Sequence, residues 1–240
     1  MKLLIDAGNT RIKWALVEGI AWLRNGVLPT AQADGLLRQL GDIRGGRQIW
    51  ASNVAGDEVA RRICDIRIEG CAAPRFIAAR ATQCGVRNGY ADPAQLGSDR
   101  WAALIAAWSL VGKRCLVASC GTATTVDSLS ETGEFIGGLI LPGVELMQRS
   151  LGSATAQLQP GEGNYAAFPR NTADALFSGA VQAVCGALER QHALLGDAGA
   201  PVILSGGGSL QLQKHLNLPL RVEDNLVLQG LLLIAQEEGA

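Results

Sequence analysis

The sequence lacks the residues and spacings that mark several common enzyme classes. It contains only two histidines, His192 and His215, and its six cysteines form no CxxC pair, so the spacing of a zinc motif is absent. GxxxxGKS/T, HExxH and GxSxG segments are also missing. These absences argue against a P-loop NTPase, a zinc peptidase and an α/β-hydrolase. The cysteines are expected to be buried, reduced thiols.

The chain also has little net charge and no long apolar run. Lysine and arginine number 21 against 22 acidic residues, and a net charge of −1 offers no basic surface for nucleic acid. The N-terminus reaches Asp6 before an apolar run of signal length develops, and the apolar segment Leu226 to Ala235 is too short to span a bilayer. We therefore expect a soluble, cytoplasmic protein without nucleic-acid or membrane partners.

The composition that remains is globular, and one segment near the N-terminus organises it. At 240 residues and 48% hydrophobic content, the chain can form one large domain or two small ones. The apolar run Met1 to Ile5 precedes the segment Asp6 to Lys13, after which apolar and polar residues alternate with a period of two. This pattern predicts a strand, a tight turn and a second strand.

The residue types in that turn suit a polyphosphate. Gly8 and Asn9 tolerate the positive φ that such a turn can need, while exposed amides, the Thr10 hydroxyl and Lys13 offset negative charge. Asp6 would repel a bare phosphate, so its position favours a Mg²⁺ ion between the two. The alternative is an ordinary hairpin whose polar residues satisfy only their own backbone.

A second candidate group lies at the start of a helix. Ser98 is expected as the N-cap, and apolar residues then recur at helical spacing from Trp101 to Trp108. Asp99 falls in the first turn, where the helix dipole favours its ionised form, next to a loop that a ligand can enter. The alternative is that Asp99 is only a favourable first-turn acid.

The strand, glycine turn and strand recur in the second half. Cys115 to Ser119 and Thr124 to Leu129 are predicted strands that flank the Gly121-Thr122 turn. Two similar halves, 1–113 and 114–240, are therefore predicted. Within the second half, Thr172 is expected to cap a helix, and Gly206 to Gly208 form a loop that can approach a flat ligand.

Six short motifs lie along the chain in a consistent order. They are Asp6-Ala7-Gly8-Asn9-Thr10, Asn88-Gly89-Tyr90, Gly97-Ser98-Asp99-Arg100, Gly121-Thr122-Ala123-Thr124-Thr125-Val126-Asp127, Leu141-Pro142-Gly143 and Arg170-Asn171-Thr172. Each is weak alone, but together they resemble the motifs of the type III pantothenate kinases. The likeness covers nearly the whole chain.

The resemblance implies a fold and an activity. The fold is α/β, with the duplicated ribonuclease-H-like domains of the acetate kinase, sugar kinase, heat-shock cognate and actin superfamily and a nucleotide cleft between them. The family phosphorylates pantothenate at its primary hydroxyl with ATP, the first step towards coenzyme A, and works as a homodimer.

The resemblance also assigns residues. Asp99 is the expected proton acceptor, and Asp6 the expected contact to Mg²⁺. Tyr90, Gly97, Ser98, Asp99, Arg100 and Thr172 are expected to bind pantothenate, and Asp6, Ala7, Gly8, Asn9, Thr10, Arg11, Ile12, Lys13 and Thr122 to bind ATP.

One position departs from the family pattern. Many members have an acid two residues before the glycine of the second turn, where it binds a monovalent cation, but this chain has Ser119. A hydroxyl attracts K⁺ or NH₄⁺ much less strongly than a carboxylate does. Neighbouring carbonyl groups or Asp127 are the alternative ligands, so the cation requirement is left open by the sequence.

Two other functions compete with the kinase. A regulatory accessory protein on the same scaffold is one, because some relatives of this family were first described in that role. The second is a kinase or phosphatase of the same superfamily that acts on a sugar or on polyphosphate. Intact Asp99, Arg100 and phosphate turns favour an enzyme, and Tyr90 together with the Gly97 to Arg100 segment favours pantothenate.

Overall fold

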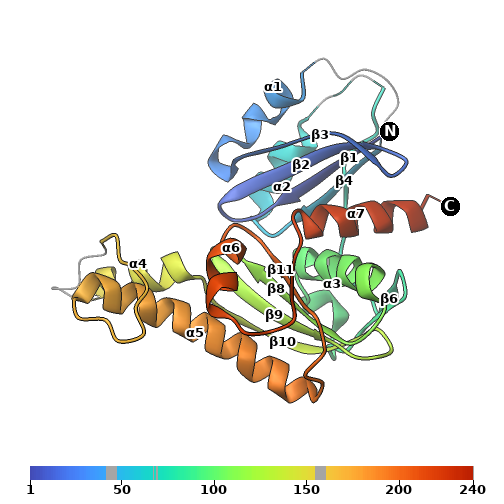
Figure 1. The fold of residues 1–240 in the computed structure, drawn as a ribbon. Helices are drawn as coiled ribbons and strands as arrows, with labels where there is room; N and C mark the ends of the chain where they lie inside the picture. Colours follow the sequence, from blue (N-terminus) through green and yellow to red (C-terminus); the bar gives the residue numbers. More distant parts are fainter. Residues whose placement is uncertain (42–47, 67, 69, 155–160, 240) are drawn as a thin grey trace. The chain divides into compact units, whose positions relative to one another are not determined.

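The computed structural model describes residues 1–41, 48–66, 68, 70–154 and 161–239. The chain divides into two units (Figure 1). The first consists of Met1–Leu110 together with Asn225–Ala240, and the second of Val111–Asp224. The described residues form two mixed β-sheets, one of five strands and one of seven.

The first unit is built on a sheet with the order β3-β2-β1-β4-β5. Strands β1 and β2, and β2 and β3, pair antiparallel, whereas β4 and β5 continue the sheet parallel to β1. The antiparallel hairpin confirms the predicted strand, turn and strand at the N-terminus. The strands are β1 (Lys2–Ala7), β2 (Arg11–Glu18), β3 (Ala21–Pro29), β4 (Gln48–Asn53) and β5 (Arg75–Phe76).

Helices cover both faces of this sheet (Figure 1). On one face, α1 (Leu36–Leu40) and α2 (Asp57–Cys64), with the 3-10 helix η1 (Thr30–Gly35), bury apolar side chains against alternate residues of β1 such as Leu3 and Ile5. On the other, α7 (Leu226–Glu237) contacts β1 and β4. Burial of apolar surface on both faces is the main stabilisation of such a layered unit.

The helix α3 (Ser98–Val111) is also part of the first unit and is almost entirely buried over Arg100 to Ala107. It passes α7 at close range, because a Cβ added to Gly230 would lie 1.9 Å from the carbonyl oxygen of Ala102. Only glycine leaves room for this approach of two backbones. The unit also contains a short hairpin, β6 (Thr82–Gln83) and β7 (Val86–Asn88), and the 3-10 helix η2 (Pro93–Gln95).

The second unit repeats the topology of the first. Its strands follow the order β10-β9-β8-β11-β12, with β8, β9 and β10 antiparallel and β11 and β12 parallel to β8, and the hairpin of β7 and β6 extends the sheet beyond β10. This repetition confirms the predicted duplication of a ribonuclease-H-like domain. The strands are β8 (Cys115–Cys120), β9 (Ala123–Leu129), β10 (Glu134–Pro142), β11 (Val202–Ser205) and β12 (Leu220–Val222).

One long helix covers a face of the second sheet. Helix α5 (Thr172–Leu195) buries Val181, Val184 and Leu188 against residues of β8 and β11 (Figure 1). The unit is completed by α4 (Val144–Ala154), α6 (Ser209–Leu212) and the 3-10 helix η3 (Gln213–His215). No helix in the described residues is long and apolar enough to cross a membrane.

The division into units differs from the predicted halves 1–113 and 114–240. The change between units falls close to the predicted position, but the C-terminal helix α7 groups with the first unit rather than the second. The reason is its apolar surface, because Leu228, Leu231 and Ile234 are buried and the helix contacts the strands of the first sheet. Apolar periodicity predicts that a helix is buried but not which sheet it covers.

Candidate active site

The turn between β1 and β2 is fixed by hydrogen bonds from one buried residue. Thr30 donates its hydroxyl to the carbonyl of Gly8 at 2.6 Å and its amide to the carbonyl of Thr10 at 3.0 Å. Gly8 closes the turn by donating its amide to the carbonyl of Arg11 at 3.1 Å. Asn9, Thr10 and Arg11 remain exposed, so a fixed turn presents polar groups outward.

The turn does not use the positive φ that its residues tolerate. Neither Gly8 nor Asn9 has a positive φ. A glycine is favoured at position 8 by lack of space rather than by its φ. A Cβ there would lie 3.3 Å from the carbonyl oxygen of Arg11, which is tighter than most Cβ contacts. The absence of a side chain also lets a ligand come close to the backbone.

Asp6 occupies a charged position at the end of β1. It lies in register with Lys13 of β2 on one side and with Ser52 of β4 on the other. The pKa of Asp6 is raised from 3.8 to about 7: burial is the largest cause, the neighbouring Asp99 also raises the pKa, and Lys13 lowers it. Two adjacent carboxyl groups with one lysine form a site that favours a proton or a cation.

The second carboxyl group, Asp99, is held at the start of α3. Its Oδ1 accepts the amide of Arg100 at 2.8 Å, and a Cβ at Gly97 would lie 2.7 Å from that same oxygen. Gly97 therefore leaves the space that the Asp99 carboxylate occupies. The carbonyl of Gly97 also accepts the amide of Trp101 at 3.0 Å and so begins the helix.

Ser98 does not act as the predicted N-cap. It is the first residue of α3, and its hydroxyl lies 2.9 Å from the hydroxyl of Ser52. Ser52 is completely buried at the end of β4. The side chain of Ser98 therefore joins the helix to the sheet.

Arg100 and Tyr90 form a cationic group close by in the chain. The guanidinium Nη1 of Arg100 donates to the Tyr90 hydroxyl at 3.1 Å, and its central carbon lies 5.8 Å from the centre of the ring. Arg100 is 5% exposed. The amide of Tyr90 in turn donates to the side chain of Asn88 at 3.0 Å. A positioned guanidinium with an adjacent hydroxyl suits a carboxylate ligand.

The turn of the second unit is built from close backbone packing. Gly121 donates its amide to Ala123, and Gly143 donates to the carbonyl of Thr122 at 2.8 Å. A Cβ at Gly143 would lie 2.1 Å from the carbonyl oxygen of Gly121. The glycine loop after β11 packs here too, since Gly208 donates to the carbonyl of Cys120 at 3.0 Å. Backbone groups of three segments thus meet beside Gly121 and Thr122.

The strand end of the second unit that corresponds to Asp6 carries hydroxyl groups instead of charged side chains. Ser119 of β8 lies in register with Thr125 of β9 and Ser205 of β11. The Thr125 hydroxyl oxygen is buried without a hydrogen-bond partner. In the described part of the chain, no three His, Cys, Asp or Glu residues gather in a geometry that could hold a metal ion.

Thr172 is the first residue of α5 but does not cap it. The cap is Asn171, whose side chain accepts the amide of Asp174 at 2.9 Å, so the prediction for Thr172 was wrong. Asparagine is a better N-cap than threonine, and the sequence offers both side by side. Thr172 instead lines a cavity of ≈ 820 Å³ between α4 and α5, together with Arg170 and Asn171.

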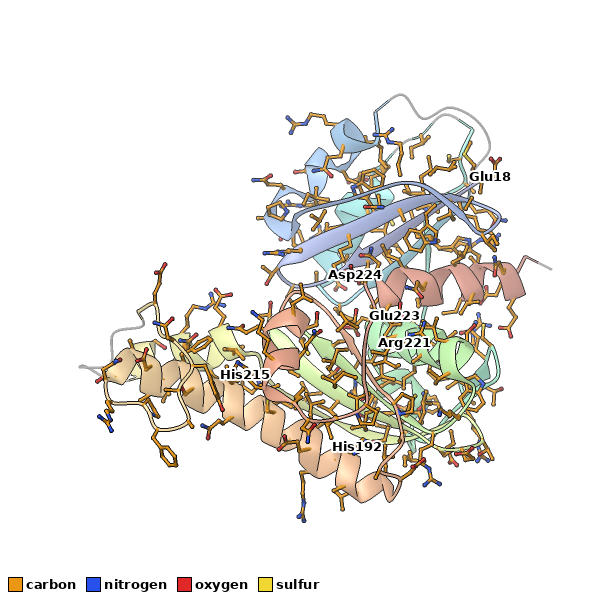
Figure 2. All side chains as sticks on the ribbon, in the orientation of Figure 1. Glu18, His192, His215, Arg221, Glu223 and Asp224 are labelled. Carbon is orange, nitrogen blue, oxygen red and sulfur yellow. The ribbon has the colours of Figure 1, made fainter. Side chains whose placement is uncertain are left out.

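The histidines and cysteines have structural surroundings. His192 and His215 lie apart in the second unit (Figure 2): the first bonds to the carbonyl of Ala200 at 2.9 Å and the second stacks on Tyr165 at 3.9 Å. Burial raises the pKa of the Cys115 and Cys120 thiols to about 12. All six cysteines lie in the described part of the chain, and they form no disulfide: Cys64, Cys71, Cys84, Cys115, Cys120 and Cys185. The expectation that the cysteines are buried holds for Cys115, Cys120 and Cys185, whereas Cys71 and Cys84 are only partly buried and Cys64 is exposed.

The first unit therefore brings together most of the predicted site. Asp6, Lys13 and Asp99 interact electrostatically, while Arg100 bonds to Tyr90. Thr122 and Thr172 belong to the second unit, at the glycine turn and at the start of α5. Two supporting residues, Thr30 and Ser52, were missed by the sequence analysis. Neither belongs to a motif, and only the folded chain brings them to the site.

The same strand order occurs in both units, and in each unit a turn follows the first strand. This arrangement is that of the actin-like ATPase and sugar kinase fold. A Campylobacter jejuni protein described as a Baf family transcriptional activator matches with a TM-score of 0.64 at 20% identity, covering 99% of this chain and 98% of the other. A 2-dehydro-3-deoxygalactonokinase structure from Sinorhizobium meliloti gives the same score at 16% identity, covering 99% of each chain. At these identities the likeness concerns the fold.

The sequence comparisons define the family. The model of the type III pantothenate kinase family matches residues 2–193. The type III pantothenate kinase of Nitrosospira multiformis is 50% identical over 238 residues, which cover 98% of this chain and 91% of that protein. The chain therefore belongs to the type III pantothenate kinase family, a family of phosphotransferases.

Proposed function

We propose that this protein transfers the γ-phosphoryl group of ATP to the primary hydroxyl of pantothenate, giving 4′-phosphopantothenate for coenzyme A synthesis. Membership of the family supports the reaction. The observation that carries the proposal is the interaction of Asp6, Lys13 and Asp99 within one unit, since phosphoryl transfer needs charge placed around the reacting groups rather than covalent chemistry.

The first turn is proposed to bind the phosphates of ATP. Its exposed residues Asn9, Thr10 and Arg11 surround a backbone that Thr30 keeps in place, and Lys13 adds a positive charge. Thr122, at the glycine turn of the second unit, is proposed to contact the phosphates as well. Its neighbour Gly121 has no side chain to block approach to the backbone. The remaining proposed ATP-binding residues are Asp6, Ala7, Gly8 and Ile12.

The carboxylates fit a divalent cation. Asp6 has a raised pKa of about 7 partly because Asp99 is near, and a cation relieves that repulsion. Mg²⁺ commonly takes one or two carboxylates and completes its shell with phosphate and water oxygens, which agrees with the small number of acidic residues here. When bound, Mg²⁺ would neutralise phosphate charge, and Asp6 is the residue proposed to hold it.

Pantothenate is proposed to lie at the start of α3. The Arg100 guanidinium, fixed by Tyr90, is suited to the carboxylate of pantothenate, and Gly97 and Ser98 border the same helix end. Thr172, which lines the cavity beside α5, is proposed as a further contact. With pantothenate bound in this way, its primary hydroxyl is proposed to face Asp99.

Asp99 is proposed to orient that hydroxyl and to accept its proton. Phosphoryl transfer has a loose transition state in which the proton leaves late, so Asp99 need only orient the hydroxyl and accept its proton at the end of the step. Gly97 keeps the space in which the Asp99 carboxylate sits.

We further propose that turnover does not require K⁺ or NH₄⁺. Ser119 and its two neighbours in register, Thr125 and Ser205, offer hydroxyl oxygens but no charge. Asp127 lies in register with Val117, two residues before Ser119, and so at a different position along the strand. Neutral oxygen ligands attract a monovalent cation weakly.

We also propose that the protein is a homodimer, as its resemblance to the family implies. The competing function is a regulatory accessory protein on the same scaffold, to which the name of the Campylobacter jejuni neighbour points. The intact carboxyl pair and the Arg100 to Tyr90 bond favour the kinase.

The experiment is ATP-dependent phosphorylation of pantothenate by the purified protein with Mg²⁺, in Na⁺, K⁺ and NH₄⁺ salts. Formation of 4′-phosphopantothenate in all three supports both the kinase and its independence of K⁺. Activity in K⁺ and NH₄⁺ alone would overturn the second proposal, and no activity in any salt would overturn the first. The mass of the protein in solution tests the homodimer.

A further inference from the structure

Ser52 is a buried polar residue that belongs to none of the predicted site motifs. It is completely buried at the end of β4, where its neighbours in the strand, Trp50 and Ala51, are apolar core residues. Burial of a hydroxyl group is unfavourable unless the group forms a hydrogen bond. Its partner is the hydroxyl of Ser98, at 2.9 Å and 46 residues further along the chain.

The position of Ser52 connects it to both carboxyl groups of the site. In the sheet it lies in register with Asp6 of the parallel strand β1, so the two side chains emerge on the same face. Through Ser98 it reaches the first residue of α3, directly before Asp99. One hydroxyl group thus links the strand that neighbours Asp6 to the helix that carries Asp99.

The first residues of α3 are less buried than the turns that follow them. The helix is buried from Arg100 to Ala107, whereas Gly97, Ser98 and Asp99 are only partly buried. Asp99 bonds to the amide of the next residue, which fixes its side chain relative to its own helix but not relative to the sheet. The Ser52 to Ser98 bond supplies that second restraint.

We propose that Ser52 is a positioning residue for phosphoryl transfer: by holding Ser98, it sets the distance between the Asp99 carboxylate on α3 and Asp6 on β1. The inference rests on the proposed kinase activity. Catalysis depends on placing the hydroxyl, the proton acceptor and the phosphate within a narrow range, and a displacement of about 1 Å can cost about 100-fold in rate.

The test compares Ser52→Ala with a matched serine elsewhere. Ser178 is also buried, at 1% exposure, and its hydroxyl accepts the amide of Ala166 at 2.9 Å, but it lies on α5 outside the proposed site. Ser52→Ala should lower kcat about 10-fold or more with KM for ATP little changed, and Ser178→Ala should leave kcat unchanged. Ser52→Thr, which keeps the hydroxyl, should restore kcat to within about 3-fold of wild type.

A double-mutant cycle separates positioning from general destabilisation. If Ser52 acts through Ser98, then Ser52→Ala combined with Ser98→Ala should lower kcat no further than the larger single effect, because both variants break one bond. Multiplication of the two single effects would overturn the proposal. So would a kcat for Ser52→Ala equal to that of wild type.

Hydrogen exchange gives a readout that does not depend on turnover. In Ser52→Ala, amides 98–101 should exchange faster while those of β1 and β2 keep their wild-type rates. Faster exchange over the whole unit would show lost stability rather than lost positioning and would overturn the proposal. Absence of pantothenate phosphorylation by the wild-type protein would defeat the proposed function alone, and the exchange comparison would still decide whether Ser52 holds the start of α3.

Discussion

The turn after β1 and the turn after β8 occupy the same place in two copies of one topology, yet they are built differently. Asp6 and Ser119 each lie two residues before the glycine of the turn. Asp6 has Lys13 and Ser52 in register, which makes a charged set. Ser119 has only hydroxyl neighbours, as described above.

The backbone around the two turns differs as well. The first is held by side-chain and backbone bonds from Thr30, and its own residues stay exposed. The second is packed against other glycines, with Gly143 and Gly206 in positions where a Cβ would approach backbone atoms within 2.5 Å. Duplication has therefore kept the strand order, whereas the turn of the first unit carries charge and the turn of the second is built by close backbone packing.

The largest effect is expected from the charged set. Asp99→Asn should lower kcat by about 100-fold or more, the usual scale for loss of a proton acceptor, while the fold and ATP binding persist. The matched control is Asp57→Asn, which removes another first-turn acid, on α2, where it is exposed. Steady-state kinetics of both variants measure the difference. Near-normal turnover of Asp99→Asn would remove Asp99 from that role.

The glycine of the second turn is expected to matter for the ligand rather than for the fold. A Cβ at Gly121 meets its nearest atom, the Ala123 carbonyl oxygen, at an ordinary 3.6 Å. Gly121→Val should therefore keep the melting temperature close to wild type but weaken ATP binding by about 100-fold, since its side chain crowds the proposed phosphate position. Calorimetric titration with ATP measures the affinity.

Gly143→Val provides the contrast to that variant. Its Cβ would collide with the carbonyl oxygen of Gly121, so the protein should lose stability outright. Unchanged ATP affinity in Gly121→Val would show that the second turn does not contact the phosphates. The comparison of the two turns would then describe architecture only.

The parts of the site that the sequence predicts are those with local signals. Alternation of period two locates the hairpins, and helical spacing locates α3 and places Asp99 in its first turn. Thr30 and Ser52 have no such signal, because their partners lie 22 and 46 residues away. The same limit applies to α7, whose sequence indicates burial but not the sheet that it covers.

The raised pKa of Asp6 predicts how stability depends on pH. Because the folded-state pKa, about 7, lies above the unfolded value of 3.8, the folded protein retains a proton that the unfolded chain has released between these values. The contribution of this proton to stability is present below about pH 4 and is lost as the pH rises to about 7. Asp6→Asn has no carboxyl group to titrate and so does not lose this stability. The difference between its melting temperature and that of wild type should therefore grow in favour of the variant as the pH rises from about 4 to about 7.

Melting curves in metal-free buffer from pH 4 to 8 test this prediction. A matched variant is Asp34→Asn, which removes an exposed acid of η1 and should follow the wild-type curve. Addition of Mg²⁺ should narrow the gap between wild type and Asp6→Asn, because a cation stabilises the ionised carboxylate. A gap that stays constant with pH would contradict the burial and the Asp99 interaction as causes.

The smallest effect on turnover is expected at Ser119, the uncharged position in the second unit that corresponds to Asp6. If the hydroxyl groups around Ser119 bind no monovalent cation, then Ser119→Ala should change turnover by less than about 3-fold, and equally in Na⁺ and K⁺. Ser119→Asp places at this position the carboxylate that Asp6 provides in the first unit, and at 4 Å a unit charge attracts a cation by about 1 kcal/mol in water and about 4 kcal/mol near a protein surface. The rate of that variant should increase with K⁺, whereas that of the neutral Ser119→Asn should not.

The contradicting outcome is a wild-type requirement for K⁺ that Ser119→Ala removes. It would mean that neutral oxygen ligands are enough to bind the cation. The difference in charge between the two turns would then have no functional meaning.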